Sequence, residues 1–493
     1  MEILSLLIFI PLVGALLVML LPRRNPSAIR VMALLWTLGE FVLSLFLYFN
    51  FDERVPTMQF QEKVPWFPEW GVSYFVGVDG ISLLLIMLTT FLSILCILCS
   101  WEAIEDKLKE YYASFLILET AMVGAFCALD LVLFYIFWEL MLIPMYLLIG
   151  VWGGPRRIYA AVKFFLFTMA GSVLMLLSIL AVYFHYGQET GIYTFNILEL
   201  YKANIPFPKQ FWLFAAFALS FAIKVPMFPV HTWLPDAHTE APTAGSVILA
   251  GVLLKMGTYG FLRFALPLFP QAAWASIPVM SILAIVGIIY GALMCLMQKD
   301  LKRLIAYSSV SHLGYVMLGI FAFNLQGLEG GIYQMLNHGI STGGLFLIVG
   351  MIYERRHTRM IADFGGLSKV MPKLAAFFLI VTLSSIALPG TNGFVGEFLI
   401  LLGAFRSYIP YGVLAATGVI LGAAYMLYMF KRVMFGVVTK EENRLLKDLT
   451  KREVVILTAI VFFIFAMGIY PQPFFKKMDV TVTHYLKYLE TKR

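Results

Sequence analysis

Residues 211–238 read FWLFAAFALSFAIKVPMFPVHTWLPDAH and decide the fold. Positions 211–230 are long and apolar enough for a membrane helix, which needs about 20 mostly apolar residues. The same stretch contains Lys224, Pro226 and Pro229. A proline removes a backbone donor and displaces the carbonyl four residues earlier. In lipid such carbonyls must be buried in protein or line a wet cavity. The stretch therefore predicts a broken membrane helix that carries a charge.

The rest of the chain is equally apolar. Of its 493 residues, 61% are hydrophobic and only 13% are charged, whereas a soluble domain carries about 25% charged residues. The excess apolar surface must face lipid, and no polar linker divides it. We therefore expect one all-α integral membrane protein. The net charge of +7 does not indicate nucleic acid, because Lys and Arg lie in short loops where they set topology.

About fourteen apolar segments are long enough to span a bilayer. They cover residues 3–21, 30–50, 78–100, 112–129, 131–150, 160–184, 211–230, 244–265, 274–297, 304–323, 331–353, 374–402, 408–434 and 453–470. Lys and Arg are concentrated in the loops after odd-numbered spans, which predicts that these loops lie inside and both termini outside. The tail, 471–493, is expected to lie along the membrane surface or to contact a neighbour.

The twelfth span is also broken. It contains Pro389 among Gly390, Gly393 and Gly396. Broken helices at corresponding places in two halves are typical of inverted-repeat transporters. Because spans seven and twelve are five apart, we predict two inverted five-helix repeats, spans 4–8 and 9–13. The expected divisions are residues 1–110 for the first three spans, 111–267 and 268–435 for the repeats, and 436–493 for the last span and tail.

Ionisable residues deep in these spans are the candidate functional residues. A charge at membrane depth costs about 2.5–3.5 kcal/mol on insertion scales, so such residues mark ion paths by default. The alternatives are a static buried ion pair and a snorkelling side chain, and snorkelling suits residues near span ends. The deep residues are Glu119, Glu139, Lys224, Lys255, His312, His338 and Glu397; those near ends are Asp79, Asp130, Lys163 and Arg263. Glu119 and Glu40 have no evident partner, and both interpretations stay open for them.

Lysine and histidine are suited to carrying protons. Burial disfavours the charged form of a lysine and a nearby carboxylate restores it, so a partner can switch its charge. We expect Glu139 to be the partner of Lys224. His312 and His338 follow polar residues at helical spacing, which predicts a hydrated lane in which histidine acts as a relay.

The cysteines do not indicate a cofactor. All four, including the C-x-x-C pair Cys96 and Cys99, lie in apolar runs, and no second pair completes a metal site. We expect this chain to bind no cofactor and no metal.

Five motifs resemble one known family. They are FWE (137–139), PMFPVHTWLPDAHTEAPTAGS (226–246), KDLKRLIAYSSVSH (299–312), PGTNGFVGE (389–397) and DLTKRE (448–453). In this order they are similar to the antiporter-like subunits of respiratory complex I and to the Mrp-type sodium/proton antiporters. The resemblance runs from about residue 70 to residue 473.

The resemblance implies fourteen helices with two inverted repeats, and it implies residue roles. Glu139 and Lys224 would be the coupled pair, Lys255 the central lysine and Glu397 the acid on the second broken helix. His312 and His338 would connect them; possible accessory residues are Glu119, His231 and His238. Most relatives carry lysine where this chain has Glu397, and glutamate there points to the M-type group.

The function expected from the resemblance is proton translocation in NADH:quinone oxidoreductase, beside L-type and N-type antiporter-like subunits in a bacterial plasma (inner) membrane. NADH, FMN, iron–sulfur clusters and quinone would then belong to partner subunits. One alternative is a subunit of an Mrp-type sodium/proton antiporter without redox coupling. The other is a structural scaffold or a catalytic oxidoreductase chain, for which no cofactor motif is present.

Overall fold

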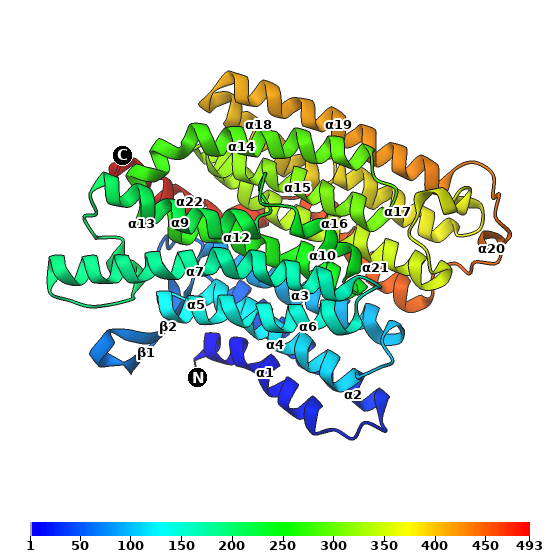
Figure 1. The fold of residues 1–493 in the computed structure, drawn as a ribbon, viewed down its shortest axis with the longest axis horizontal. Coiled ribbons are helices and arrows are strands. Elements are labelled where there is room, and N and C mark those ends of the chain that lie inside the picture. The colour runs from blue at the N-terminus through cyan, green and yellow to red at the C-terminus, as the bar shows by residue number, and fades with distance from the viewer. Residues whose placement is uncertain (1) are drawn as a thin grey trace.

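The computed structural model describes residues 2–493 and is a bundle of long helices that run side by side (Figure 1). The helices before the first break are α1 (Ile3–Leu20), α2 (Pro26–Asn50), α3 (Gly80–Ala103), α4 (Leu108–Cys127), α5 (Leu131–Leu140), α6 (Leu142–Trp152), α7 (Arg157–Thr190), α8 (Ile197–Leu200) and α9 (Phe207–Lys224). Those between the breaks are α10 (Trp233–Glu240), α11 (Thr243–Ile248), α12 (Leu254–Gly260), α13 (Leu266–Leu268), α14 (Pro270–Leu296), α15 (Leu301–Ile320), α16 (Leu325–Arg356) and α17 (Pro372–Ser385). The last are α18 (Asn392–Ser407), α19 (Ile409–Met434), α20 (Glu441–Arg444), α21 (Lys451–Ile469) and α22 (Gln472–Thr491).

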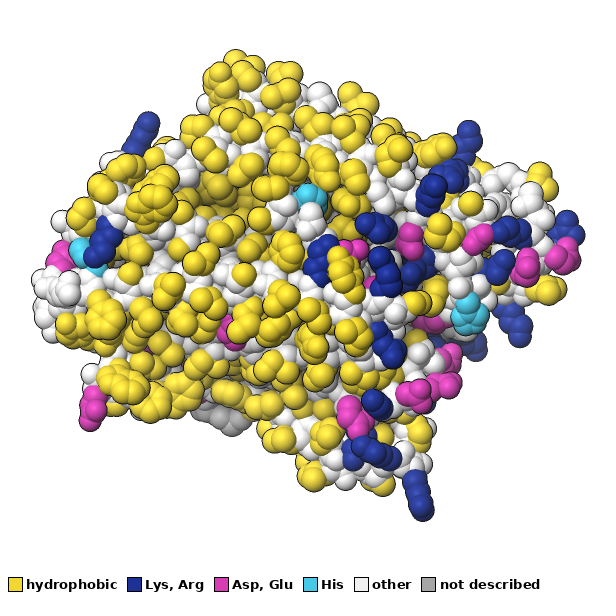
Figure 2. Space-filling model, viewed as in Figure 1, with side chains coloured by type: hydrophobic (Ala, Val, Ile, Leu, Met, Phe, Trp, Pro, Cys, Tyr) yellow, Lys and Arg dark blue, Asp and Glu magenta, His cyan; other side chains and the backbone are white. Residues whose placement is uncertain are grey.

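The predicted all-α membrane fold is confirmed. Within residues 2–493, ten helical segments are long and apolar enough to cross a membrane. The remaining predicted spans correspond to α4, to α15 and to the interrupted pairs α9/α10 and α17/α18. Figure 2 shows apolar side chains over most of the visible face, with Lys, Arg, Asp and Glu gathered toward the right-hand end, where α20 lies in Figure 1.

The two predicted helix breaks are present and are built alike. One separates Lys224 from Trp233, and the other separates Ser385 from Asn392. In each, a backbone N–H reaches back five residues. Met227 donates to the carbonyl of Ala222 at 2.9 Å, and Leu388 donates to that of Leu383 at 3.1 Å. Pro226 has no N–H to donate to the carbonyl of Ala222, and the N–H of Met227, one residue further along the chain, bonds to this carbonyl instead. The division into four residue ranges stays a prediction.

The eighth span holds an irregularity that the sequence does not reveal. On both sides of α12 the backbone is π-helical, in η2 (Leu249–Leu253) and η3 (Phe261–Ala265). Such wide turns frequently occur at functional sites. They bracket Lys255, which lies on α12.

Two further elements differ from expectation. An antiparallel hairpin, β1 (Gln59–Phe67) and β2 (Val72–Val78), lies between α2 and α3. The tail forms α22, which packs on α3 and α16 of the same chain and buries Met478 and Val482. The apolar face of the tail is thus covered by its own bundle, and its position at the membrane surface or against a neighbour stays a prediction.

For Asp79, Asp130 and Arg263 the interpretation as snorkelling residues is wrong, because all three are buried. Arg263 and Asp79 are both buried and form an ion pair at 2.5 Å between Nη2 and Oδ2. Asp130 is fully buried, caps α5 and accepts a hydrogen bond from the Ser73 N–H at 3.0 Å. Nζ of Lys163 lies 2.7 Å from Oδ2 of Asp236. These charges have protein partners because the helices that carry them meet inside the bundle.

Candidate functional site

Lys255 and His338 form the centre of the candidate site. Lys255 is fully buried, and its Nζ donates to the carbonyl of Ala250 in η2 at 2.5 Å. The same Nζ lies 2.6 Å from Nδ1 of His338, a buried residue of α16. The structure therefore joins a lysine and a histidine from two different spans by one hydrogen bond, away from solvent.

Gly257 brings this lysine helix against the first helix break. A Cβ at this position would lie 2.7 Å from the carbonyl oxygen of Phe221 and 2.9 Å from the amide nitrogen of Val225. Only a residue without a Cβ allows α12 to approach the end of α9 so closely. The helix of Lys255 is thus packed directly on the helix that ends at Lys224.

His312 and Glu397 form the second contact. Nδ1 of His312, on α15, lies 3.0 Å from Oε1 of Glu397, on α18. Gln334 donates to the same oxygen at 3.0 Å, and Asn337 donates to Gln334 at 3.0 Å. All four side chains are buried. Gly396 makes the space, because a Cβ there would lie 2.5 Å from Oε1 of Gln334.

The two contacts are separated by a short gap. The rings of His312 and His338 are 5.8 Å apart between centroids. A cavity of about 10 Å³, close to what one water needs, is lined by both histidines together with Gln334, Asn337 and serines of α16 and α17. The polar lining and the size fit a bridging water.

Serines and an asparagine near the second break were not predicted from the sequence. Oγ of Ser384 lies 2.6 Å from Oγ of Ser341 and 2.6 Å from Oδ1 of Asn392. Oγ of Ser385 lies 3.4 Å from Nε2 of His312. The available signal was three small polar residues, Thr382, Ser384 and Ser385, inside an otherwise apolar span.

Lys224 and the predicted partner Glu139 form no hydrogen bond or ion pair with each other. Lys224 is 1% exposed, and its Nζ has no hydrogen-bond partner among residues 2–493. The ammonium lies 5.2 Å from the centre of the Trp138 ring and 5.7 Å from that of Phe164, within cation–π range. Glu139 is half-buried, and its Oε1 also lacks a partner in the described chain. Their coupling stays a prediction.

The accessory candidates lie outside the main contacts. His231 lies in the first break and His238 on α10, and neither has a hydrogen-bonded ring nitrogen within the described residues. His238 is buried and stacks on Phe346 at 4.6 Å between centroids. Glu119 is fully buried on α4.

The possible metal ligands and the cysteines of the described chain are placed as follows. Within residues 2–493, no group of three or more His, Cys, Asp or Glu is placed to hold a metal ion. The sulfurs of Cys96 and Cys99 are buried free thiols, and that of Cys99 contacts the carbonyl of Cys96 at 3.3 Å. The site is built of proton-exchanging groups and hydrogen-bonding side chains.

Two sequence profiles together match residues 6–422, and many relatives match nearly the whole chain. The profile described as NADH:quinone oxidoreductase/Mrp antiporter, TM, matches residues 128–422. The profile of the NADH-ubiquinone oxidoreductase chain 4 amino terminus matches residues 6–128. NADH-quinone oxidoreductase subunit M of Rhodobacter capsulatus is 49% identical over 98% of this chain and 96% of its own length. NADH-ubiquinone oxidoreductase chain 4 of Marchantia polymorpha is 45% identical over 98% and 97%.

Solved structures share the fold. A chain of respiratory complex I from Thermus thermophilus with bound NADH superposes with a TM-score of 0.90 at 34% identity, covering 99% of both chains. A chain of the Mrp complex from Dietzia sp. DQ12-45-1b superposes with a TM-score of 0.83 at 22% identity, covering 99% of this chain and 52% of that one. The second likeness concerns the fold alone.

Proposed function

The chain belongs to the family of NADH:quinone oxidoreductase and Mrp antiporter membrane subunits, and from that premise we propose a path for protons through it. It is a membrane subunit of NADH:quinone oxidoreductase, an assembly that couples electron transfer to proton translocation. Within that assembly it lies in the membrane with other antiporter-like subunits. In this subunit the proton would move along buried titratable side chains.

The proposed path runs from Lys255 through His338 and His312 to Glu397. The observation that carries it is the pair of direct contacts, 2.6 Å from Lys255 to His338 and 3.0 Å from His312 to Glu397, on four buried side chains. Lone titratable groups at membrane depth are costly and are typical of proton relays. Here they form a row that crosses α12, α16, α15 and α18.

The hydrogen-bond pattern supports a direction of transfer. A charged lysine can donate hydrogen bonds but cannot accept them, so Nδ1 of His338 accepts a hydrogen bond from Lys255. The single proton of the neutral imidazole ring is therefore on Nε2. This Nε2 has no partner in the described chain and can donate to a water in the small cavity. From there His312 accepts a proton and passes it to Glu397 through its other nitrogen. We place Lys224 and Glu139 at the start of the path, where a change in their charges would deliver a proton to Lys255.

The surroundings that we propose rest on the same family membership. The membrane is a bacterial plasma (inner) membrane, with both termini and the less charged end of the bundle outside. L-type and N-type antiporter-like subunits are the proposed neighbours. NADH, FMN, iron–sulfur clusters and quinone would be bound by partner subunits, and this chain would supply proton transfer only. The Mrp-type alternative is less well supported, because the 49% identity over nearly the whole chain is to a redox-linked subunit.

Replacing His338 by leucine tests the path. The variant removes the ring that connects Lys255 to the cavity, and leucine has a similar volume. In the assembled complex in proteoliposomes we expect proton pumping to fall to about a tenth or less, since a positioned proton-transfer group contributes about 10²–10⁴-fold. His484→Leu, at an exposed position on α22, is the control. Wild-type pumping by a fully assembled His338→Leu complex would rule out this route.

A further inference from the structure

Glu40 and Glu119 come together in a part of the bundle that the proposed path does not use. Glu40 lies on α2 and Glu119 on α4, both fully buried. Helix α4 packs on both α2 and α3, and this packing brings the two carboxyl groups and the Ser93 hydroxyl of α3 close to one another. Within residues 2–493, the four carboxyl oxygens and this hydroxyl have no hydrogen-bond partner.

The pair belongs to a polar seam between α2 and α3. Thr37, Glu40 and Ser44 are spaced three and four residues apart, so they share one face of α2, and all three are fully buried. Oγ of Ser44 lies 2.9 Å from Oγ1 of Thr90 on α3. Ser93 follows Thr90 by three residues and so lies on the same face of α3. The seam runs between helices that are otherwise apolar.

In the part of the chain that the structure describes, no positively charged side chain is bonded to either acid. The titratable side chains that face them are the thiols of Cys127, on α4, and Cys96, on α3. Helix α1, which packs on α2 and α4, has no titratable residue. Within residues 2–493, neither carboxyl group is hydrogen-bonded to a Lys, Arg or His side chain. Two carboxylates that meet in a low-dielectric site cannot both ionise, and such dyads share a proton.

We propose that Glu40 and Glu119 form a proton-binding site, in which one proton is held in an O–H···O bond between the two carboxyl groups and the Ser93 hydroxyl supports the charged oxygen. The site binds a second proton to become neutral and releases it again. The only bond that forms and breaks in this step is the O–H bond of the second proton. It is separate from the Lys255–Glu397 row and does not depend on that row carrying protons. A proton gained or lost here changes the charge between α2 and α4.

Infrared difference spectroscopy of the purified whole complex during a pH titration tests the proposal. The variants are E40Q, E119Q and E40Q/E119Q, which keep side-chain shape, and E105Q is the control because Glu105 is exposed. Wild type should show a C=O band of a protonated carboxylic acid that persists at alkaline pH. The double variant should lose this band, each single variant should shift it, and E105Q should leave it unchanged.

Three further outcomes decide whether Glu40 and Glu119 share a proton. A band unchanged in the double variant, or at the wild-type position in both single variants, would overturn the shared proton. A band that responds to Na⁺ at constant pH would identify a metal cation as the ligand and would overturn it too. If the double variant does not assemble, the single variants decide, because each replaces only one oxygen by an amide nitrogen.

Discussion

The two buried lysines are held in different ways. Lys255 has two acceptors, the Ala250 carbonyl and Nδ1 of His338. Within residues 2–493, Lys224 has only the faces of Trp138 and Phe164. The charged form of Lys224 is therefore stabilised by the aromatic rings and by any carboxylate or water that comes close to the ammonium group. This difference suits a lysine whose charge is switched and a second lysine that passes the proton on.

Substituting Lys224 distinguishes a switched charge from a permanent one. We expect both Lys224→Ala and Lys224→Arg to reduce proton pumping to about a tenth or less, because arginine stays charged and cannot release its proton. Pumping and quinone reduction by the assembled complex are the measurements. Lys202→Arg, at the exposed end of an ion pair with Glu199, is the control. An active Lys224→Arg complex would show that charge alone suffices.

Gly396 tests the geometry around Glu397 without changing a titratable group. In Gly396→Ala the new Cβ would meet Oε1 of Gln334 at 2.5 Å and Nδ2 of Asn337 at 2.7 Å, so the amides must move away from Glu397. We expect a several-fold loss of pumping with normal assembly. Gly422→Ala is the matched control, because nothing lies within 4 Å of a Cβ there. Equal activities in both variants would contradict the role of the amides.

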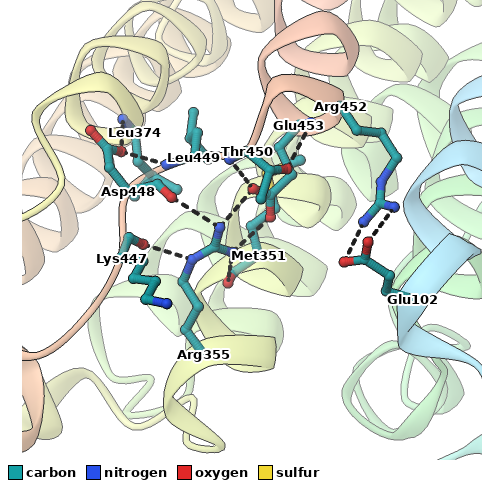
Figure 3. Close-up of polar contacts among 10 residues, drawn as sticks. All are labelled: Glu102, Met351, Arg355, Leu374, Lys447, Asp448, Leu449, Thr450, Arg452 and Glu453. Carbon is teal, nitrogen blue, oxygen red and sulfur yellow. Dashed lines mark hydrogen bonds and ion pairs between the residues drawn. The ribbon is translucent and has the colours of Figure 1, made fainter.

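At the scale of elements, the segment 447–453 fastens α21 to its neighbours at the charged end (Figure 3). Arg355 of α16 forms two bonds to the carboxylate of Glu453, at 2.6 and 2.7 Å, and donates to the carbonyl of Lys447 at 2.8 Å. Asp448 accepts from the backbone of Leu374 at the start of α17. The DLTKRE motif thus has a structural role: it joins three helices.

Removing this ion pair should destabilise the subunit. In Glu453→Gln the Arg355 guanidinium, whose side chain is 15% exposed, loses its counter-charge, which costs about 1–3 kcal/mol. The measurement is the thermal stability of the purified complex together with the yield of this subunit in it. Glu441→Gln, in a surface pair with Arg444 and 72% exposed, should cost only about 0–1 kcal/mol. Similar losses in both variants would refute the structural role.

The elements could largely be predicted from the sequence, because apolar length and proline positions determine them locally. The broken spans at Pro226, Pro229 and Pro389 are in place. The π-helical turns beside Lys255 could not be foreseen, since no residue type marks them. The contacts of Lys255 with His338 and of His312 with Glu397 join distant spans, so they required the packed bundle. For the same reason the partner of Glu40 was not evident.

For the whole molecule, the distribution of charge predicts how the bundle lies in the membrane. The end near α20 carries the clustered charges (Figure 2), and the positive-inside rule assigns it to the inside. We expect Leu445→Cys to react with a membrane-impermeant thiol reagent only from the inside, and Lys492→Cys only from the outside. Both positions are exposed, and the four native cysteines are buried, so background labelling is low. Labelling from the opposite sides would reverse the proposed topology.

The most direct test of the proton path is the number of protons pumped per NADH oxidised by the assembled complex when Lys255 is replaced by methionine. Methionine fills the same buried space but cannot hold a proton or donate to His338. The path predicts fewer protons per NADH than in wild type, while Lys202→Met leaves the ratio unchanged. A Lys255→Met complex that assembles fully and keeps the wild-type ratio would contradict it.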